Sequence, residues 1–191
     1  MRCGVGLLAL CGCAATVWCH NSPMYVGSNS AGQLTVWFEF WEVEELAQHR
    51  AGFPGWLGNE VSVVEVIFND PVRDLHPVAA GAKLMIEVVA FDPALSLWRP
   101  DLSVGVSQAG EQYALGIGGD HFAMRPWWYL DRTHPEFSYP QGVWSAQFKV
   151  IDLSGVHGES AVYTFLASPV VPGPGVVLAG VFAPVLMRRR R

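Results

Sequence analysis

Apolar and polar residues alternate along several short segments in the central part of this chain. In residues 34–41, Val36, Phe38 and Phe40 would share one face of an extended strand, while the residues between them would share the other. A period of two with one apolar face predicts a half-buried strand. The same reasoning predicts strands at residues 61–68, 83–91, 102–106, 113–117, 121–125, 127–130, 142–152 and 161–167. Turn residues separate these strands at short intervals, so the pattern predicts an all-β fold, a single antiparallel β-sandwich.

Two segments refine this prediction. Residues 42–50 are the only central segment that could form a helix, as one short connection. Residues 142–152 alternate cleanly, Leu153-Ser154-Gly155 predicts a turn, and residues 161–167 return as a final strand. This pattern resembles the closing hairpin of bacterial immunoglobulin-like domains. The resemblance implies a Greek-key sandwich, and it concerns architecture rather than function.

The N-terminal segment has the three parts of a secretory signal peptide. Arg2 supplies a positive charge, residues 4–17 carry none, and Val17 and Cys19 fit the positions before a cleavage site. We therefore expect a signal peptide at residues 1–19 and a mature protein that begins at His20. Cleavage near residues 13–15 and lipoprotein processing at Cys13 are the alternatives. A membrane span needs about 20 apolar residues, and this run is shorter.

The C-terminal segment, residues 169–191, carries three consecutive features. A proline-glycine motif is followed by an apolar run at residues 176–187 and by an arginine cluster; the motif is Val171, Pro172, Gly173, Pro174 and Gly175, and the cluster is Arg188, Arg189, Arg190 and Arg191. Positive residues stay on the cytoplasmic side of a membrane, so this tail would insert with the arginines inside. The alternative is a tail that is apolar without any sorting role.

This tail resembles a PEP-CTERM sorting signal, in which Val-Pro-Glu-Pro precedes a short hydrophobic helix and a terminal arginine cluster. Gly173 replaces the usual glutamate, and Pro184 interrupts the apolar run. The resemblance implies an exported protein that engages the export machinery and is held briefly in the inner membrane by its C-terminal helix. An exosortase-like sorting protease would then remove the tail and pass the protein to the cell surface or the extracellular matrix.

The remaining segment, residues 20–168, is one domain by length and is expected to form the sandwich. All four cysteines lie within residues 3–19, so this domain has no disulfide and no cysteine-ligated zinc. Five of the twelve basic residues belong to the two end segments, which leaves seven against seventeen acidic residues, a formal charge of about −10. Such a charge repels nucleic acid and anionic lipid, and both classes of partner are excluded on this ground.

Histidines provide one candidate ligand site. An α-amino group beside the His20 imidazole could chelate zinc or copper, and further histidines could complete the site. His121, with its neighbour Asp120, and His134 are the candidate partners. The alternative is that these scattered histidines are surface residues without a ligand role. Together with His20 and the closing hairpin, Gly119-Asp120 and Phe122 resemble a PEP-CTERM group of which some members are under zinc-uptake regulators, which favours a metal.

Aromatic residues provide a second candidate. Trp127 and Trp128 are adjacent, so a strand would bury one ring and expose the other. An exposed ring near Trp98 could form a platform that stacks on an envelope polysaccharide, whereas the alternative is that all these rings are core packing. No nucleophile elbow, dinucleotide loop, P-loop or zinc-protease motif is complete in the sequence. We therefore expect a non-enzymatic surface or matrix protein, with a zinc- or copper-binding protein and a carbohydrate-binding module as alternatives.

Overall fold

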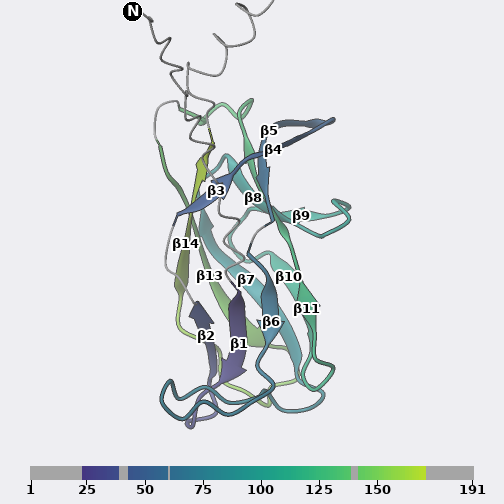
Figure 1. Ribbon diagram of the computed structural model, residues 1–191, viewed down its shortest axis with the longest axis vertical. Helices are drawn as coiled ribbons and strands as arrows, with labels where there is room; N and C mark the ends of the chain where they lie inside the picture. Colours follow the sequence, from purple (N-terminus) through teal and green to yellow (C-terminus); the bar gives the residue numbers. More distant parts are fainter. Residues whose placement is uncertain (1–22, 39–42, 60, 139–141, 171–191) are drawn as a thin grey trace, which may run out of the picture.

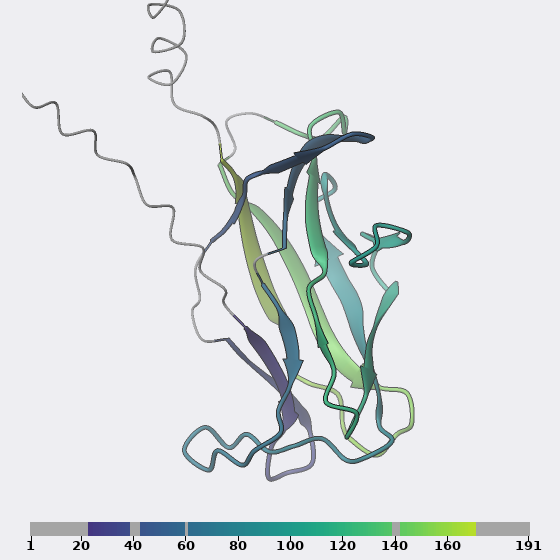
Figure 2. The same ribbon diagram turned by 45° about the vertical axis from the view of Figure 1, so that its right-hand side comes forward.

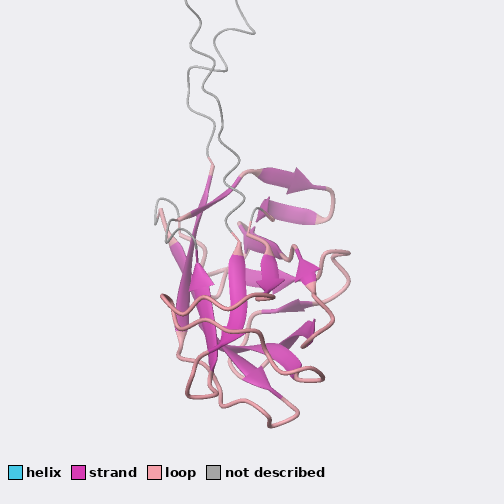
Figure 3. Ribbon diagram, turned by 60° about the horizontal axis from the view of Figure 1, so that its bottom comes forward, coloured by secondary structure: helices cyan, strands magenta, loops and turns pink. Residues whose placement is uncertain are grey.

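The computed structural model describes residues 23–38, 43–59, 61–138 and 142–170. Figure 1 shows these residues as strands joined by loops, and Figure 3 draws no helix among them. The predicted all-β class is therefore confirmed for this part of the chain. The predicted signal peptide, His20, the proline-glycine motif, the apolar run and the arginine cluster lie outside the described residues. Within the described residues, no helix is long and apolar enough to cross a bilayer.

The strands form three sheets. The N-terminal sheet has the order β11 (Ala123–Met124), β6 (Val63–Glu65), β1 (Met24–Ser28) and β2 (Leu34–Phe38). The central sheet has the order β10 (Gln112–Ile117), β7 (Lys83–Phe91), β13 (Trp144–Asp152), β14 (Tyr163–Pro169) and β3 (Glu44–Leu46). The aromatic sheet has the order β4 (Gln48–Arg50), β5 (Phe53–Gly58), β12 (Trp127–Asp131), β8 (Leu95–Trp98) and β9 (Gly105–Val106).

Most neighbouring strands are antiparallel, as the short turns require. The predicted closing hairpin is present, because β13 and β14 pair antiparallel with Trp144 opposite Ala167 and Phe148 opposite Tyr163. Two pairings are parallel, β1 with β6 and β14 with β3. Parallel neighbours need a long crossover, so their positions could not be read from local turn signals.

The main hydrophobic core draws on all three sheets. It includes Val26 from β1, Ile86 from β7, Phe148 from β13 and Leu130 from β12, each exposed by at most 1 %. In β13 the buried residues alternate with partly exposed ones, as the sequence pattern predicts for a strand with one face in the core. Burial of these large side chains is the dominant favourable contribution to folding.

The strand β12 departs from alternation and corrects one expectation. Trp127 is 5 % exposed and Trp128 is 3 % exposed, so both rings are buried. Trp128 faces the main core, whereas Trp127 and Tyr129 face a second cluster with Leu57 on the opposite side of the aromatic sheet. The expectation of one exposed ring was wrong because both faces of this central strand are covered.

The helix expected within residues 42–50 is also absent. The described residues of that segment form β3, which pairs with the end of β14, and β4, which pairs with β5. The sequence from Glu44 to Gln48 contains good helix formers, but helix propensity is a weak preference that strand pairing can override. This segment therefore joins the edges of two different sheets.

Loops gather at one end of the molecule, which we call the loop end. It comprises the β1–β2 turn, residues 66–82 between β6 and β7, the β10–β11 turn and the β13–β14 loop (Figures 1 and 2). β14 finishes at Pro169 at the opposite end of the molecule (Figure 1). Any continuation of the chain beyond Val170 therefore starts far from the loop end.

Candidate functional site

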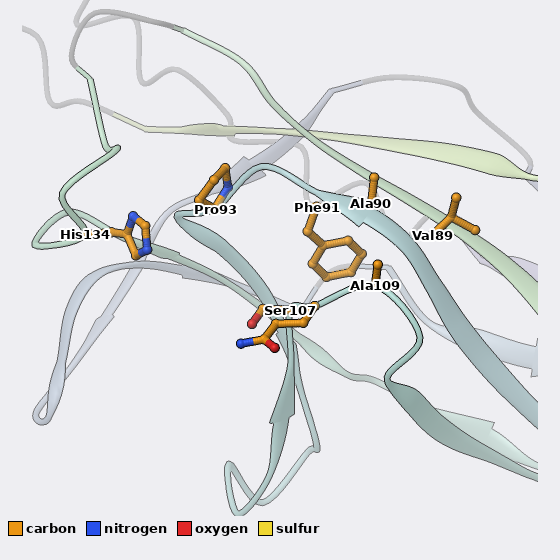
Figure 4. Close-up of a pocket in the computed structure, with 8 residues that line it drawn as sticks. Val89, Ala90, Phe91, Pro93, Ser107, Ala109 and His134 are labelled. Carbon is orange, nitrogen blue, oxygen red and sulfur yellow. The ribbon is translucent and has the colours of Figure 1, made fainter.

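A shallow groove of about 500 Å³ lies beside the C-terminal end of β7 (Figure 4). Residues 89–91 of β7 and Pro93 line one side, residues 107–109 of the β9–β10 loop line the other, and His134 lies at one end. Its volume falls within the range of about 300–1,000 Å³ that is typical of small-molecule sites. The groove is therefore one concave candidate for a ligand site among the described residues.

The floor of the groove is apolar and rests on the main core. Phe91 is half-buried, and its ring centroid lies 6.0 Å from that of Trp128. Trp128 in turn stacks on Phe165 with centroids 3.7 Å apart. Ala90 and Ala109 add small exposed side chains on either side of Phe91. This packing fixes the orientation of the Phe91 ring beneath the groove.

The β9–β10 wall is held by one carboxylate. Glu111 Oε2 accepts the backbone amides of Ser107 at 2.7 Å and Gln108 at 2.9 Å. The Ser107 amide, followed by the Gln108 amide, lowers the pKa of Glu111 below its usual value against the opposing effect of burial. Because the carboxylate is ionised near neutral pH and bound to both amides, it fixes the loop that presents the Ser107 hydroxyl and the Gln108 amide.

His134 is held in a turn that follows β12. Asp131 Oδ1 accepts the Thr133 amide at 2.8 Å and the Thr133 hydroxyl at 2.7 Å. His134 Nδ1 accepts the amide of Glu136 at 3.2 Å. A neutral imidazole whose Nδ1 accepts must carry its proton on Nε2. The ring therefore offers a hydrogen-bond donor, Nε2–H, from a fixed position at the end of the groove.

The predicted metal ligands do not meet in the described structure. Asp120 and His121 are exposed in the β10–β11 turn at the loop end, whereas His134 lines the groove near the end of β7. The turn lies near Lys83, since the Gly81 amide donates to the Gly118 carbonyl. Phe91 lies eight positions further along β7 than Lys83, at a rise of about 3.3 Å per position. Within the described residues, no three histidine, cysteine, aspartate or glutamate side chains are grouped as metal ligands.

The three tryptophans of the predicted aromatic platform belong to two hydrophobic clusters: Trp128 lies in the main core, and Trp127 and Trp98 lie in the second cluster. Trp127 and Trp98 are direct neighbours on β12 and β8, and Phe53 meets Trp98 edge to face with centroids 5.3 Å apart. The Trp127 indole donates to the Pro100 carbonyl at 3.1 Å, and Arg50 lies 4.3 Å above its ring. These contacts cover the Trp127 ring, so Trp98, Trp127 and Trp128 do not form one exposed surface.

The loop end is stabilised by a second carboxylate, that of Asp152. Burial opposes ionisation of Asp152, but the Ser154 hydroxyl and the amides of Ser154, His157 and Val156 outweigh it and lower the pKa to about 2. His157 Nε2 in turn accepts the amide of Ala79 at 2.9 Å, which ties the β13–β14 loop to residues 66–82. His157 therefore has a bridging role, which the sequence did not indicate.

We predict that Asp152 makes stability depend on acid pH. Because its pKa is lowered in the folded state, its contribution is fully present above about pH 4 and is lost as pH falls toward 2. The variant Asp152→Asn should be less stable than the parent protein by about 2 kcal/mol at pH 7, and the difference should vanish near pH 2. Urea unfolding at both pH values measures this. An equal difference at both would show that Asp152 acts without its charge.

Comparisons with known proteins give no independent identification. The chain matches no family model, no curated protein and no solved structure. A function for the protein therefore has to be argued from the sequence features of the two ends and from the geometry of the described domain.

Proposed function

We propose that this protein is an exported, non-enzymatic component of the cell surface or extracellular matrix, processed at both ends. A signal peptide at residues 1–19 would direct export, and the PEP-CTERM-like tail at residues 169–191 would be read by an exosortase-like protease. Between them, the three sheets would form one immunoglobulin-like sandwich. The shared core and the closing hairpin of β13 and β14 support this architecture.

The observation that carries the proposal is that the chain leaves the domain at the end opposite the loop end. β14 ends opposite the loop end (Figure 1), so a tail held in a membrane would leave the loop end directed away from that membrane. The loops there are joined to one another: Gly158 donates to the Gly32 carbonyl at 3.1 Å, and the Ser30 hydroxyl donates to Asp74 at 3.0 Å. These hydrogen bonds between loops hold the loop end in one conformation, as a surface displayed outside the cell would require.

The use of carboxylates supports a non-enzymatic role. Glu65, Glu111, Asp92 and Asp152 each accept hydrogen bonds from backbone amides. A carboxylate held in this way fixes a loop, and for Glu111 and Asp152 the amides also lower the pKa, whereas general acid catalysis needs a carboxyl group that can be protonated near neutral pH. These four carboxylates thus have a structural role in the fold.

Fractionation of cells tests the proposal. We would express the full chain, and a chain ending at Val170, in a bacterium that has an exosortase and in a matched strain that lacks one. The full chain should lose its tail and reach the surface or medium only in the first strain, and should stay in the inner membrane at full length in the second. The shortened chain should bypass the membrane in both. Retention of every form in the cytoplasm, with residues 1–19 still attached, would contradict the proposal.

A further inference from the structure

The groove beside β7 has a chemical character that differs from the rest of the domain. The domain as a whole is strongly acidic, yet none of the eight lining residues is an aspartate, glutamate, lysine or arginine. Two carboxylates close in sequence to the lining residues, Glu111 and Asp92, accept the amides of Ser107 and Ser145. The groove therefore presents a neutral surface to a ligand.

Apolar and hydrogen-bonding groups are segregated within it. Phe91 and Pro93 provide an apolar floor, and Ala90 and Ala109 leave space above it (Figure 4). The rim carries the Ser107 hydroxyl, the Gln108 amide and His134 Nε2–H. Within the described residues, these three groups have no protein partner, whereas His134 Nδ1 and the Ser107 and Gln108 backbone amides do. The side-chain groups on the rim are therefore available to a ligand.

A sugar ring matches this arrangement. Its C–H faces are apolar and pack against aromatic and proline rings, while its hydroxyl groups at the edge both donate and accept hydrogen bonds. Gln108 and Ser107 can do both, and His134 Nε2–H donates. Pockets that bind small molecules combine an apolar lining with a few fixed polar groups in this way.

We infer that the groove formed by residues 89–91, Pro93, residues 107–109 and His134 binds a neutral sugar unit of a polysaccharide. This inference goes beyond the proposed function and does not depend on how the tail is processed. It differs from the platform considered from the sequence, because Trp127 and Trp128 are buried and only Phe91 supplies an aromatic floor. The groove is shallow, so binding of a single sugar unit should be weak. A polysaccharide with many such units would gain affinity when several copies of the protein bind it together.

Saturation-transfer NMR on the purified full chain tests the inference. The protein would be held in a detergent without a sugar headgroup, and the probes would be cellotriose, maltotriose and N,N′-diacetylchitobiose at up to about 10 mM, a range suited to weak binding. Trialanine would serve as a peptide probe. We expect saturation of at least one of the sugars and none of trialanine.

Two substitutions localise the binding. Ala109→Arg would fill the groove from an exposed position and should abolish the sugar signal, whereas Ala114→Arg, at an exposed alanine of β10 outside the groove, should leave it unchanged. Gln108→Ala should weaken binding by about fivefold to tenfold, the loss of one hydrogen bond. Thermal unfolding of each variant would confirm that the fold is intact.

Three results would overturn the inference. They are the absence of saturation in all three sugars, equal sugar binding by the Ala109→Arg and Ala114→Arg variants, and a trialanine signal that alone disappears in the Ala109→Arg variant. The last would show that the groove accepts a peptide instead. None of these results bears on export or tail processing, which the fractionation experiment tests separately.

Discussion

Gly55→Ala is expected to destabilise the domain by at least about 3 kcal/mol or to prevent folding. Gly55 lies on β5 opposite Asp131 of β12, and a Cβ atom there would lie 1.9 Å from the carbonyl oxygen of Leu130. That oxygen belongs to the backbone of the neighbouring strand, so the clash cannot be relieved by rotating a side chain. β12 would have to move, and Trp128 and Leu130 would leave the main core with it.

Gly158→Ala provides the matched control. A Cβ atom at Gly158 would meet its nearest neighbour, Gln33 Cγ, at 3.4 Å, which is ordinary contact. We expect a change within about 0.5 kcal/mol for this variant. Urea unfolding of the two variants beside the parent protein makes the comparison. Similar stability for Gly55→Ala and the parent would show that β5 and β12 are not packed as described.

Glu65→Ala is expected to lower the free energy of unfolding by about 3 kcal/mol and to increase local opening of the β10–β11 turn. Glu65 is 3 % exposed, and its two carboxylate oxygens accept the amides of Gly119 at 2.6 Å and Phe122 at 3.3 Å. The turn contains positive φ angles at Gly119 and His121, which few residues adopt without support. A buried polar group that loses its hydrogen-bond partner costs about 1–3 kcal/mol, and this variant removes the acceptor of both amides.

Hydrogen exchange measures this effect where it is expected. The Gly119 and Phe122 amides should exchange much faster in the Glu65→Ala variant, and Glu65→Gln should give a smaller effect because one acceptor oxygen remains. Glu45→Ala, at an exposed carboxylate on β3, should change neither stability nor exchange at these amides. Unaltered exchange at Gly119 and Phe122 in the Glu65→Ala variant would show that the Glu65 carboxylate does not hold the β10–β11 turn.

The sequence predicted those strands that have a clear alternating or β-branched pattern between turn residues. Residues 83–91 coincide with β7, and residues 142–152 and 161–167 include most of β13 and β14. β5 was missed because its sequence, Phe53-Pro-Gly-Trp-Leu-Gly58, is rich in residues that usually mark turns. It is nevertheless a strand, because it lies between β4 and β12 and its glycines permit close approach of the backbone.

The candidate groove was beyond sequence reasoning for a different reason. Its residues come from three segments, residues 89–93, residues 107–109 and His134, and nothing in their spacing indicates that they meet. His134 was singled out as a metal ligand, but the structure places it beside Phe91 and Pro93, far from His121. The buried Glu65 was equally invisible, since a glutamate in an apolar strand does not reveal which amides it will bind.

The central claim is that the domain is displayed outside the cell with its loop end exposed, and single-cysteine labelling tests it most directly. The sequence has no cysteine beyond residue 19, so Val72→Cys introduces a unique thiol into the mature protein, at a loop-end position that is 91 % exposed. Intact cells of the exosortase-containing strain would be treated with a membrane-impermeant maleimide. The account predicts labelling of the Val72→Cys protein on intact cells or in the medium, and none of the parent protein. Labelling that occurs only after the cells are lysed would contradict it.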